Sequence, residues 1–388
     1  MCRRDRVKTR LVDDTGSEVD VLCVKGSGWD LGDIEPPGLP AVRLDTLSAL
    51  RARPSLSDED MVNAQRTRLL DASSPNPSVE TLLHAFLPAK FIDHSHADAI
   101  LALVDQPEAE RIAKEIFGET LAIVPYVMPG FDLAKLAAEV CDAHPDAEGL
   151  LLLKHGLFTW GETARQSYER HVDAVSKAEA FISSHRQTVV VEAPAPLSWT
   201  RVGPLLRGRL GGGDRRYVLT HRRSEAVDSY LQRDDLADVS QRGVPTPDHV
   251  IRTKRVPLLL ELDASMSDEA MIAHIDGRLT AFRADYERYV SEQSAAKGRT
   301  VQMLDSDPRV VLIPGIGIVA AGATPKAASV AADLHEHCVA VIEAAEAVGR
   351  YEVLPLSDDF VLPPVHFGRC RRSTARSSLC PPSTRLHI

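Results

Sequence analysis

Residues 76–100 read NPSVETLLHAFLPAKFIDHSHADAI, and this stretch decides how the chain around it is interpreted. A turn at Asn76-Pro77 precedes Glu80, after which apolar residues recur at helical spacing. The pattern then changes to a short strand that ends near His94 and His96. Because strand side chains two residues apart point to the same face, these two histidines can bind one cation.

A third histidine lies at the end of another predicted strand. Residues 149–153 form a continuous apolar run, typical of a strand covered on both faces, and His155 follows it closely. A lone His-x-His pair is more often structural than metal-binding, but a cleft at a sheet end can collect such residues. Three imidazoles with one open position are the arrangement of catalytic zinc. We therefore predict a metal site at His94, His96 and His155.

Glu80 is the candidate acid/base of this site. A metal that holds a carbonyl oxygen stabilises an enediolate, and a carboxylate within hydrogen-bond reach can remove or return the proton. The alternative is that Glu80 only stabilises a helix N-terminus through the helix dipole. Both roles can hold together. Asp98 has two interpretations as well, as a support for a ligand histidine or as a helix-capping residue.

A glycine-punctuated loop, Lys25-Gly26-Ser27-Gly28, follows a predicted strand at residues 19–24. Glycines let backbone N–H groups approach an anion closely, and the lysine and serine add donors, so a phosphate is a plausible ligand of this loop. Most such triplets are ordinary turns, and this interpretation also stays open at this point.

Composition narrows the classes of function. The chain has 388 residues, 44% of them hydrophobic, and a net charge of −10, which fits a two-domain globular protein without a nucleic-acid footprint. Its six cysteines form no CxxC pair, which argues against a zinc ribbon or a disulfide framework and favours a reducing compartment. No run of about 18 apolar residues could span a membrane. We predict a cytoplasmic protein without a membrane partner.

Helical and strand patterns alternate, which predicts a mixed α/β fold. We expect a metal-containing domain over residues 1–188 and a second half over residues 189–356. The remaining residues 357–388 are rich in arginine and show no amphipathic period, which predicts a disordered tail.

The second half repeats the first with an offset of 161 residues. Gly156 and Gly161 fall on Gly317 and Gly322, and Thr163 falls on Thr324. Asp248-His249 is the expected counterpart of Asp93-His94, while His96 and His155 fall on Ile251 and Ile316, which cannot bind a metal. We therefore expect a degenerate copy that serves as a scaffold or an interface.

One glycine-rich motif resembles a cofactor-binding site but has another interpretation. The run Gly315-Ile-Gly317-Ile-Val-Ala320 matches a dinucleotide-binding fingerprint after a strand. The repeat, however, aligns it with the turn at residues 154–158, which is a hairpin and not the start of a helix. We therefore expect no NAD.

Taken together, the motifs resemble the class II aldolase/adducin family. The residues that carry the resemblance are PSVE, the HSH triplet before a helix, KHG after a leucine run, and KGSG after the first strand. The runs VKGSGWDL, RGVPTPDH and VLIPGIG are similar to the aldolase portion of bifunctional rhamnulose-1-phosphate aldolase/short-chain dehydrogenase (lactaldehyde dehydrogenase) proteins. The resemblance covers about residues 7–356.

The resemblance implies a three-layer α/β/α fold with a mixed central sheet, and commonly a homo-oligomer. It implies retro-aldol cleavage of a ketose 1-phosphate in rhamnose metabolism, with L-rhamnulose 1-phosphate giving dihydroxyacetone phosphate and L-lactaldehyde. Carried over by position, it makes Glu80 the acid/base, and it assigns zinc, or another divalent metal, to His94, His96 and His155, and the substrate phosphate to Ser27, Gly28 and Ser78.

Two departures from the family pattern shape the alternatives. Relatives carry a glycine-rich phosphate loop before the first strand and continue into a dehydrogenase domain, so we expect an N-terminally truncated aldolase without the oxidation of lactaldehyde. An epimerase or dehydratase of the same family is one rival. A non-catalytic, adducin-like protein or an inactive fragment is another, and the intact Glu80 and histidines argue against it.

Overall fold

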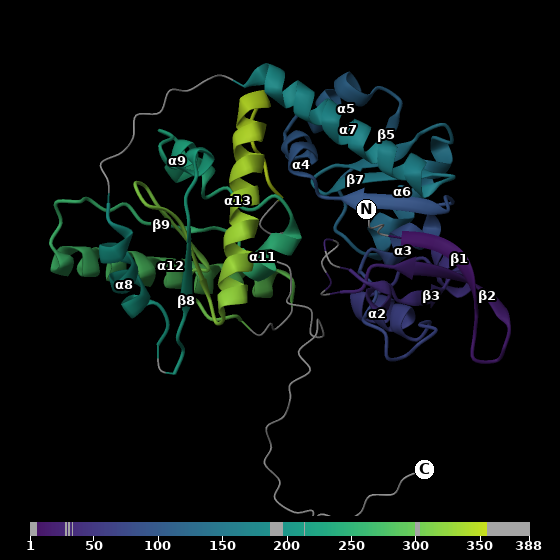
Figure 1. Ribbon diagram of the computed structural model, residues 1–388, viewed down its shortest axis with the longest axis horizontal. Helices are drawn as coiled ribbons and strands as arrows, with labels where there is room; N and C mark the ends of the chain where they lie inside the picture. Colours follow the sequence, from purple (N-terminus) through teal and green to yellow (C-terminus); the bar gives the residue numbers. More distant parts are fainter. Residues whose placement is uncertain are drawn as a thin grey trace, which may run out of the picture.

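The computed structural model describes residues 6–27, 29, 32, 34–186, 197–212, 214–298 and 303–354. Two sheets, one of seven and one of four strands, stand on either side of a central helical region (Figure 1). We call residues up to 186 the first half and residues from 197 the second half. The predicted mixed α/β fold is confirmed, whereas Gly28 and the predicted tail at residues 357–388 lie outside the described residues.

The seven-stranded sheet belongs to the first half. Only β5 and β6 pair in parallel, and the other neighbours are antiparallel. In spatial order the strands are β3 (Ala41–Arg43), β2 (Glu18–Val24), β1 (Arg6–Val12), β4 (Phe91–Ser95), β7 (Gly156–Gly161), β6 (Gly149–Leu152) and β5 (Leu121–Val124). The strand with the His-x-His pair therefore lies beside the hairpin that contains His155.

Helices cover both faces of this sheet, because alternate residues of its central strands are buried on opposite sides. Leu150 and Leu152 join one apolar core, whereas Leu151 joins the other. The first core is packed by α1 (Leu44–Ser48), α2 (Asp58–Arg66), α3 (Thr81–Phe86) and α6 (Phe131–Ala143), and the second by α4 (Asp98–Val104), α5 (Ala109–Phe117) and α7 (Ala164–His185). Short 3-10 helices lie at Pro36–Gly38 and Ala49–Ala52.

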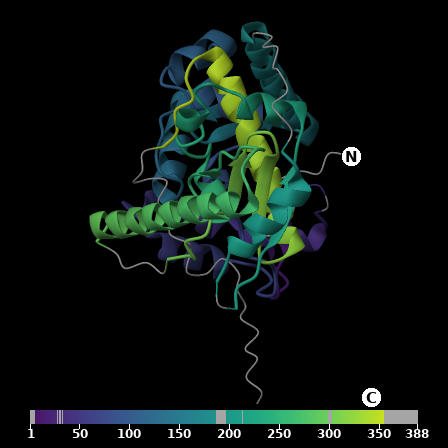
Figure 2. The ribbon, with the colours of Figure 1, turned by 90° about the vertical axis from the view of Figure 1, so that its left-hand side faces the viewer.

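The four-stranded sheet belongs to the second half. Its order is β8 (Val218–Arg222), β11 (Gly317–Gly322), β10 (Val310–Ile313) and β9 (Leu258–Leu259). The helices are α8 (Trp199–Arg209), α9 (Glu225–Leu231), α10 (Leu236–Val239), α11 (Pro247–Thr253), α12 (Asp268–Ala296) and α13 (Pro325–Val348). The long α12 lies across the side of this half that Figure 2 presents to the viewer. Among the described residues, no helix combines the length and hydrophobicity that a membrane span requires.

The internal repeat is visible in the backbone. Strands β10 and β11 and helix α13 each begin 161 positions after β6, β7 and α7. Both long helices start in the same way, since the Thr163 and Thr324 hydroxyls accept hydrogen bonds from the backbone N–H three residues on. The Gly315–Ala320 run lies in the β10–β11 hairpin. It does not open a helix, as dinucleotide binding would require.

The prediction that His249 is the counterpart of His94 is wrong. In the first sheet His94 pairs with Phe158, and in the second His221 pairs with Val319, which stands 161 positions after Phe158. The counterpart of His94 is therefore His221, on β8. His249 instead lies on α11, a helix between α10 and β9 that shifts the numbering of everything after it.

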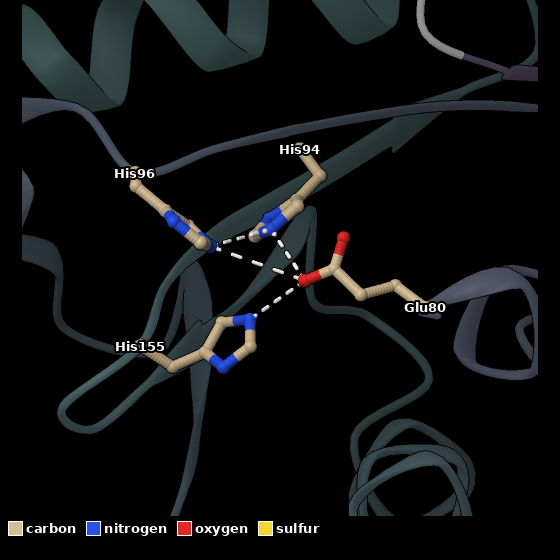
Figure 3. A group of neighbouring side chains, drawn as sticks. All are labelled: Glu80, His94, His96 and His155. Carbon is tan, nitrogen blue, oxygen red and sulfur yellow. Dashed lines mark hydrogen bonds and ion pairs between the residues drawn. The ribbon is translucent and has the colours of Figure 1, made fainter. Parts of the chain in front are cut away.

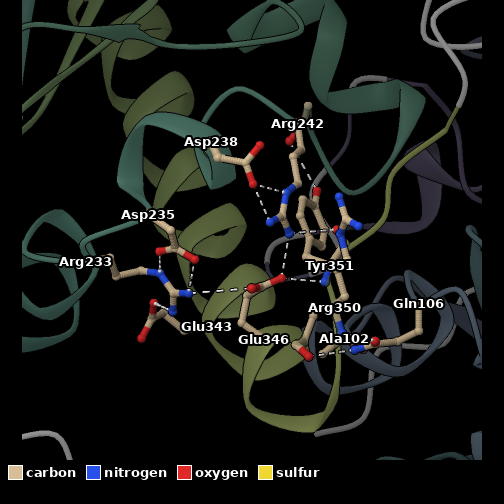
Figure 4. A network of polar contacts seen from close by, with 12 residues as sticks. Ala102, Gln106, Arg233, Asp235, Asp238, Arg242, Glu343, Glu346, Arg350 and Tyr351 are labelled. Atoms are coloured by element: carbon tan, nitrogen blue, oxygen red, sulfur yellow. Dashed lines mark hydrogen bonds and ion pairs between the residues drawn. The ribbon is translucent and has the colours of Figure 1, made fainter.

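A network of polar contacts joins the two halves (Figure 4). The Gln106 side-chain amide donates to the backbone carbonyls of Ala102, at 3.0 Å, and Ala345, at 2.7 Å, and its oxygen accepts from the Arg350 N–H at 2.8 Å. Beyond α13 the chain returns to the first half, where the Lys154 ammonium donates to the Glu352 carbonyl at 2.7 Å. Lys154 directly precedes His155, so the second half is anchored next to the predicted metal site.

Candidate metal centre

Strand β4 and the residue that follows it supply the first two histidines. The His94 ring stacks on Phe158 of β7 with centroids 3.9 Å apart, and its Nδ1 donates a hydrogen bond to the Leu157 carbonyl at 2.9 Å. Because Nδ1 is engaged in this hydrogen bond, Nε2 is the ring nitrogen that faces the other residues of the site. The His96 Nε2 atom lies 3.0 Å from the His94 Nε2 atom.

The turn between β6 and β7 delivers the third histidine. Lys154 and Gly156 flank His155, and both have positive φ angles, 55° and 159°. A Cβ on Gly156 would lie 2.6 Å from the Ser95 carbonyl oxygen and 2.9 Å from the His96 ring. Glycine at this position therefore lets the turn pack against the end of β4, which brings His155 to the other two histidines.

Glu80 reaches the same point from the start of α3. Its Oε1 atom accepts from the His155 Nε2 at 2.9 Å and lies 3.1 Å from the His94 Nε2 and 3.9 Å from the His96 Nε2 (Figure 3). One donor atom from each of the four residues falls within 4.8 Å of the others. The structure thus brings together all four residues that the sequence singled out for metal binding and acid/base chemistry.

Burial and charge act in opposite directions on Glu80. Burial alone would raise the pKa of its carboxyl group, but the charge of His94 and the hydrogen bond from His155 outweigh it and hold the pKa well below the usual range. Burial, together with repulsion from His94 and His155, holds the pKa of His96 well below its usual range. At neutral pH the site therefore contains a carboxylate and a neutral His96, the form in which an imidazole binds metals.

The donor set fits a divalent transition metal. Two nitrogens that each bind zinc at about 2.0–2.1 Å in a tetrahedral site lie about 3.3 Å apart. The 3.0 Å separation of the His94 and His96 Nε2 atoms is close to that spacing. Imidazole nitrogens together with a carboxylate oxygen suit zinc and its neighbours in the transition series better than calcium or magnesium.

Two of the predicted phosphate-binding residues lie next to the cluster. The Ser27 N–H donates to the Asn76 carbonyl at 2.8 Å and the Ser78 N–H donates to the Lys25 carbonyl at 3.1 Å, so the two loops run side by side. The Ser78 hydroxyl accepts from the Glu80 N–H at 3.4 Å. The Ser78 hydroxyl therefore adjoins Glu80, and the loop that contains Ser27 lies directly beside the Ser78 loop.

A second polar group lies on the opposite face of β4 and was not predicted from the sequence. The His171 Nε2 lies 2.6 Å from the Ser95 hydroxyl and its Nδ1 lies 2.9 Å from the Thr159 hydroxyl. The Ser167 hydroxyl donates to Asp93 at 2.6 Å. Strand alternation was the available signal, because Asp93 and Ser95 must point away from the face that presents His94. These contacts fasten β4 to α7.

The side chain of Asp98 takes neither of the two roles expected of it, which were to support a ligand histidine or to cap a helix. Its Oδ2 atom accepts a hydrogen bond from the Nδ1 of His337, on α13 of the second half, at 2.8 Å. Helix α4, which follows His96 along the chain, is thereby tied to the second half.

Two protein-family models match the chain. Residues 9–182 match the class II aldolase and adducin N-terminal domain. Residues 198–362 match the second domain of class II aldolase.

Several known proteins are similar to parts or most of the chain. The uncharacterized oxidoreductase YuxG of Bacillus subtilis (strain 168) is 33% identical over 365 residues, which are 91% of this chain and 52% of that protein. A methylthioribulose-1-phosphate dehydratase of Sorangium cellulosum (strain So ce56) is 31% identical over 31% of this chain and 65% of its own length. The chain thus spans between about half and two thirds of the length of these curated relatives.

A solved structure is similar to part of the chain. The N-terminal class II aldolase domain of a conserved protein from Thermoplasma acidophilum is 42% identical, with 46% of this chain and 82% of that chain covered and a TM-score of 0.43.

Proposed function

Because the chain belongs to the class II aldolase and adducin family, we propose that it is a metal-dependent lyase that cleaves a ketose 1-phosphate. The substrate we propose is L-rhamnulose 1-phosphate, and the products are dihydroxyacetone phosphate and L-lactaldehyde. The observation that carries the proposal is the convergence of three histidine Nε2 atoms on one carboxylate oxygen of Glu80. Zinc is the proposed metal.

The three histidines and Glu80 have different roles in the proposed reaction. A divalent cation bound by His94, His96 and His155 would polarise the carbonyl group of the substrate and stabilise the negative charge that cleavage leaves on its oxygen. Glu80 is the proton carrier. When the C3–C4 bond breaks, the C4 hydroxyl loses a proton as the aldehyde forms, and C3 of the phosphate-bearing fragment gains one. Glu80 borders all three imidazoles and is therefore close enough to deliver that proton to C3.

The phosphate of the substrate would bind beside Glu80. Ser27 and Ser78 lie on two adjoining loops there, and we propose that they hold the phosphate together with Gly28. The low pKa of Glu80 keeps this carboxylate charged, so the loops must supply enough donors to offset its repulsion of the phosphate. The hydroxyl groups of Ser27 and Ser78 provide such donors without adding charge. The backbone N–H groups of the same two residues already donate to carbonyls across the two loops.

Dehydration of a sugar phosphate is a second candidate function. The observation in its favour is the 31% identity to a methylthioribulose-1-phosphate dehydratase. Dehydration and retro-aldol cleavage both begin from a polarised carbonyl and a positioned base. Their products differ, because dehydration releases water and leaves the carbon chain intact.

Metal analysis joined to a cleavage assay tests the proposal. We expect about one zinc ion per chain and release of dihydroxyacetone phosphate from L-rhamnulose 1-phosphate. Glu80→Gln should lower the rate at least about 100-fold, a typical loss for a general acid/base, while Glu139→Gln, an exposed change on α6, leaves it unchanged.

Three outcomes would contradict parts of the proposal. Less than about half a metal ion per chain favours a non-catalytic, adducin-like protein. Release of a dehydrated sugar phosphate without dihydroxyacetone phosphate favours the dehydratase. Equal rates for the wild-type protein and Glu80→Gln refute the role of Glu80.

A further inference from the structure

The turn that carries His155 has a counterpart in the second half. In both turns the N–H of the fourth residue donates to the carbonyl of the first, at 3.2 Å in residues 152–155 and at 2.9 Å in residues 313–316. The third residue has a positive φ in both, 55° at Lys154 and 82° at Gly315. The two turns are therefore closed in the same way, but only the second half has glycine at the position with the left-handed backbone.

Lys154 stands at a position that favours glycine. A left-handed backbone brings the Cβ of a side chain too close to a carbonyl oxygen. Among the described residues, only Lys154 and Lys254 combine a side chain with a positive φ. The second half, whose Ile316 cannot bind a metal, has the unstrained residue, whereas the half with His155 keeps the strained one. Such strain persists at functional sites when neighbouring groups hold it in place, so a function of the lysine side chain accounts for the difference.

The Lys154 side chain reaches the segment that follows α13, and we call residues 349–354 the strap. The Lys154 ammonium donates to the Glu352 carbonyl oxygen at 2.7 Å and to the Glu352 Oε1 at 3.1 Å. Only 16% of the Lys154 side chain is exposed, although half of the Glu352 side chain is. The lysine is therefore held mainly through the backbone of the strap, which cannot turn away as a surface carboxylate can.

The strap is itself fixed by both halves. The Arg350 N–H donates to the Gln106 side chain at 2.8 Å, and the Tyr351 N–H donates to the Glu346 carboxylate at 2.6 Å (Figure 4). Tyr351 is fully buried, and its hydroxyl donates to the Gly243 carbonyl at 3.2 Å. A lysine that binds this segment is therefore attached to a well-ordered part of the protein.

Glu352 also connects the turn with His155 to the segment that carries the other ligands. Its N–H donates to the carbonyl of Asp105, the residue that ends α4, at 2.9 Å. Helix α4 begins two residues after His96. Contacts that start at Lys154 therefore join the turn of His155 to the helix that follows His96.

We propose that Lys154 is a positioning residue of the metal centre, which holds His155 in its ligand position before a metal binds. The inference rests on the metal site of the proposed function. A ligand on an ordered turn loses less conformational freedom on binding than a ligand on a mobile turn, so this anchor raises the affinity for the metal. Lys154 acts through His155 and not on the metal. The second half, through the strap, thus contributes to the metal centre of the first.

The variant that tests the proposal is Lys154→Gly, which removes the ammonium and gives the turn the residue that the second half has. Its zinc affinity, measured by competition with a chelator, should fall about tenfold, as expected when a residue that orients a metal ligand is lost. Lys154→Met, which keeps the stem of the side chain, should show the same loss. Lys154→Arg keeps a cationic donor and should restore most of the affinity. Cobalt(II) at saturation should give the wild-type visible absorption spectrum in every variant, because the ligands are unchanged.

Lys114→Gln is the matched control, because it breaks an exposed lysine–carboxylate pair, 2.7 Å long, on α5. It should bind zinc as the wild-type protein does, and urea unfolding of the metal-free proteins checks that each variant is folded. Wild-type zinc affinity in Lys154→Gly and Lys154→Met refutes the inference. A changed cobalt spectrum at saturation also overturns it, because Lys154 then acts on the bound metal. If the wild-type protein binds no zinc, the proposed function itself fails, and that result does not depend on any comparison between variants.

Discussion

Gly156 lies so close to the backbone of Ser95 that a Cβ at Gly156 would come within 2.6 Å of the Ser95 carbonyl oxygen. Gly317 has the same relationship to Arg222 in the second half, where the distance would be 2.3 Å. The φ angles of the two glycines are 159° and 135°. Both halves therefore require glycine at the start of the same strand, but only in the first half does the neighbouring strand lead into the proposed metal centre.

Substituting each of the two glycines in turn distinguishes an effect on stability from an effect on metal binding. Gly156→Ala should destabilise the protein by about 1–3 kcal/mol through backbone strain and also lower its zinc affinity, because the clash pushes β4 and the His96 ring away from His155. Gly317→Ala should cost a similar free energy of unfolding and leave the zinc affinity unchanged. Urea unfolding of the metal-free proteins and competition with a zinc chelator measure the two quantities.

Gly118→Ala controls for the φ angle alone, because Gly118 has φ 55° and a Cβ there meets nothing within 4 Å. It should lower stability slightly without a change in zinc affinity. Equal zinc affinities for Gly156→Ala and Gly317→Ala would show that the position of β4 does not depend on this contact.

The sequence was sufficient to predict which four residues come together at the candidate metal centre, and the reasons are local. Strand alternation orients His94 and His96, and an apolar run followed by Lys154-His155-Gly156 marks the third ligand. The repeat was predictable because glycines and helix caps recur at a constant offset.

The insertion of α11 was not predictable in the same way. The segment with α11 changes the offset from 127 positions at α10 to 137 at β9, and the longer α12 with the loop after it brings the offset to 161 at β10. The dipeptide Asp248-His249 lies in the inserted segment and imitates Asp93-His94 by chance. Contacts between the halves were equally hidden, since the hydrogen bond from His337 to Asp98 joins residues 239 positions apart. No periodicity in one segment reports such a contact.

His335, on α13, should be a destabilising residue. It is 3% exposed, and neither ring nitrogen has a hydrogen-bond partner among the described residues. His335→Leu should therefore raise the free energy of unfolding at pH 7 by about 1–3 kcal/mol, the cost of an unsatisfied buried polar group. Urea unfolding measures the difference.

The advantage of His335→Leu should grow in acid. Burial, followed by repulsion from His249, lowers the pKa of His335 from 6.5 to about 3. As the pH falls from 6.5 toward 3, the unfolded chain takes up the proton and the folded chain does not, so the wild-type protein loses stability in this window. His337→Leu, an exposed change two residues along, should give no such gain. A variant at His335 that is less stable than the wild-type protein at pH 7 would contradict the prediction.

Lys254 should make stability depend on alkaline pH. It is 3% exposed, has a left-handed backbone with φ 65°, and lies with its Nζ atom 3.6 Å from the Tyr286 ring centroid. Burial, followed by repulsion from Arg309, lowers the pKa of Lys254 from 10.5 to about 7. Between these values the unfolded chain holds a proton that the folded chain has lost, so the contribution of Lys254 to stability rises with pH.

Lys254→Met keeps an apolar stem of similar length and removes the proton. The free energy of unfolding of the wild-type protein should gain about 2 kcal/mol relative to this variant between pH 7 and pH 9, measured by urea unfolding at each pH. Lys326→Met, an exposed change in the first turn of α13, should follow the wild-type profile. If the Lys254→Met and wild-type profiles run parallel, the hydrogen bond of 2.6 Å from Lys254 Nζ to the Asp305 carbonyl and the neighbouring Tyr286 ring stabilise the charged ammonium enough to offset its burial.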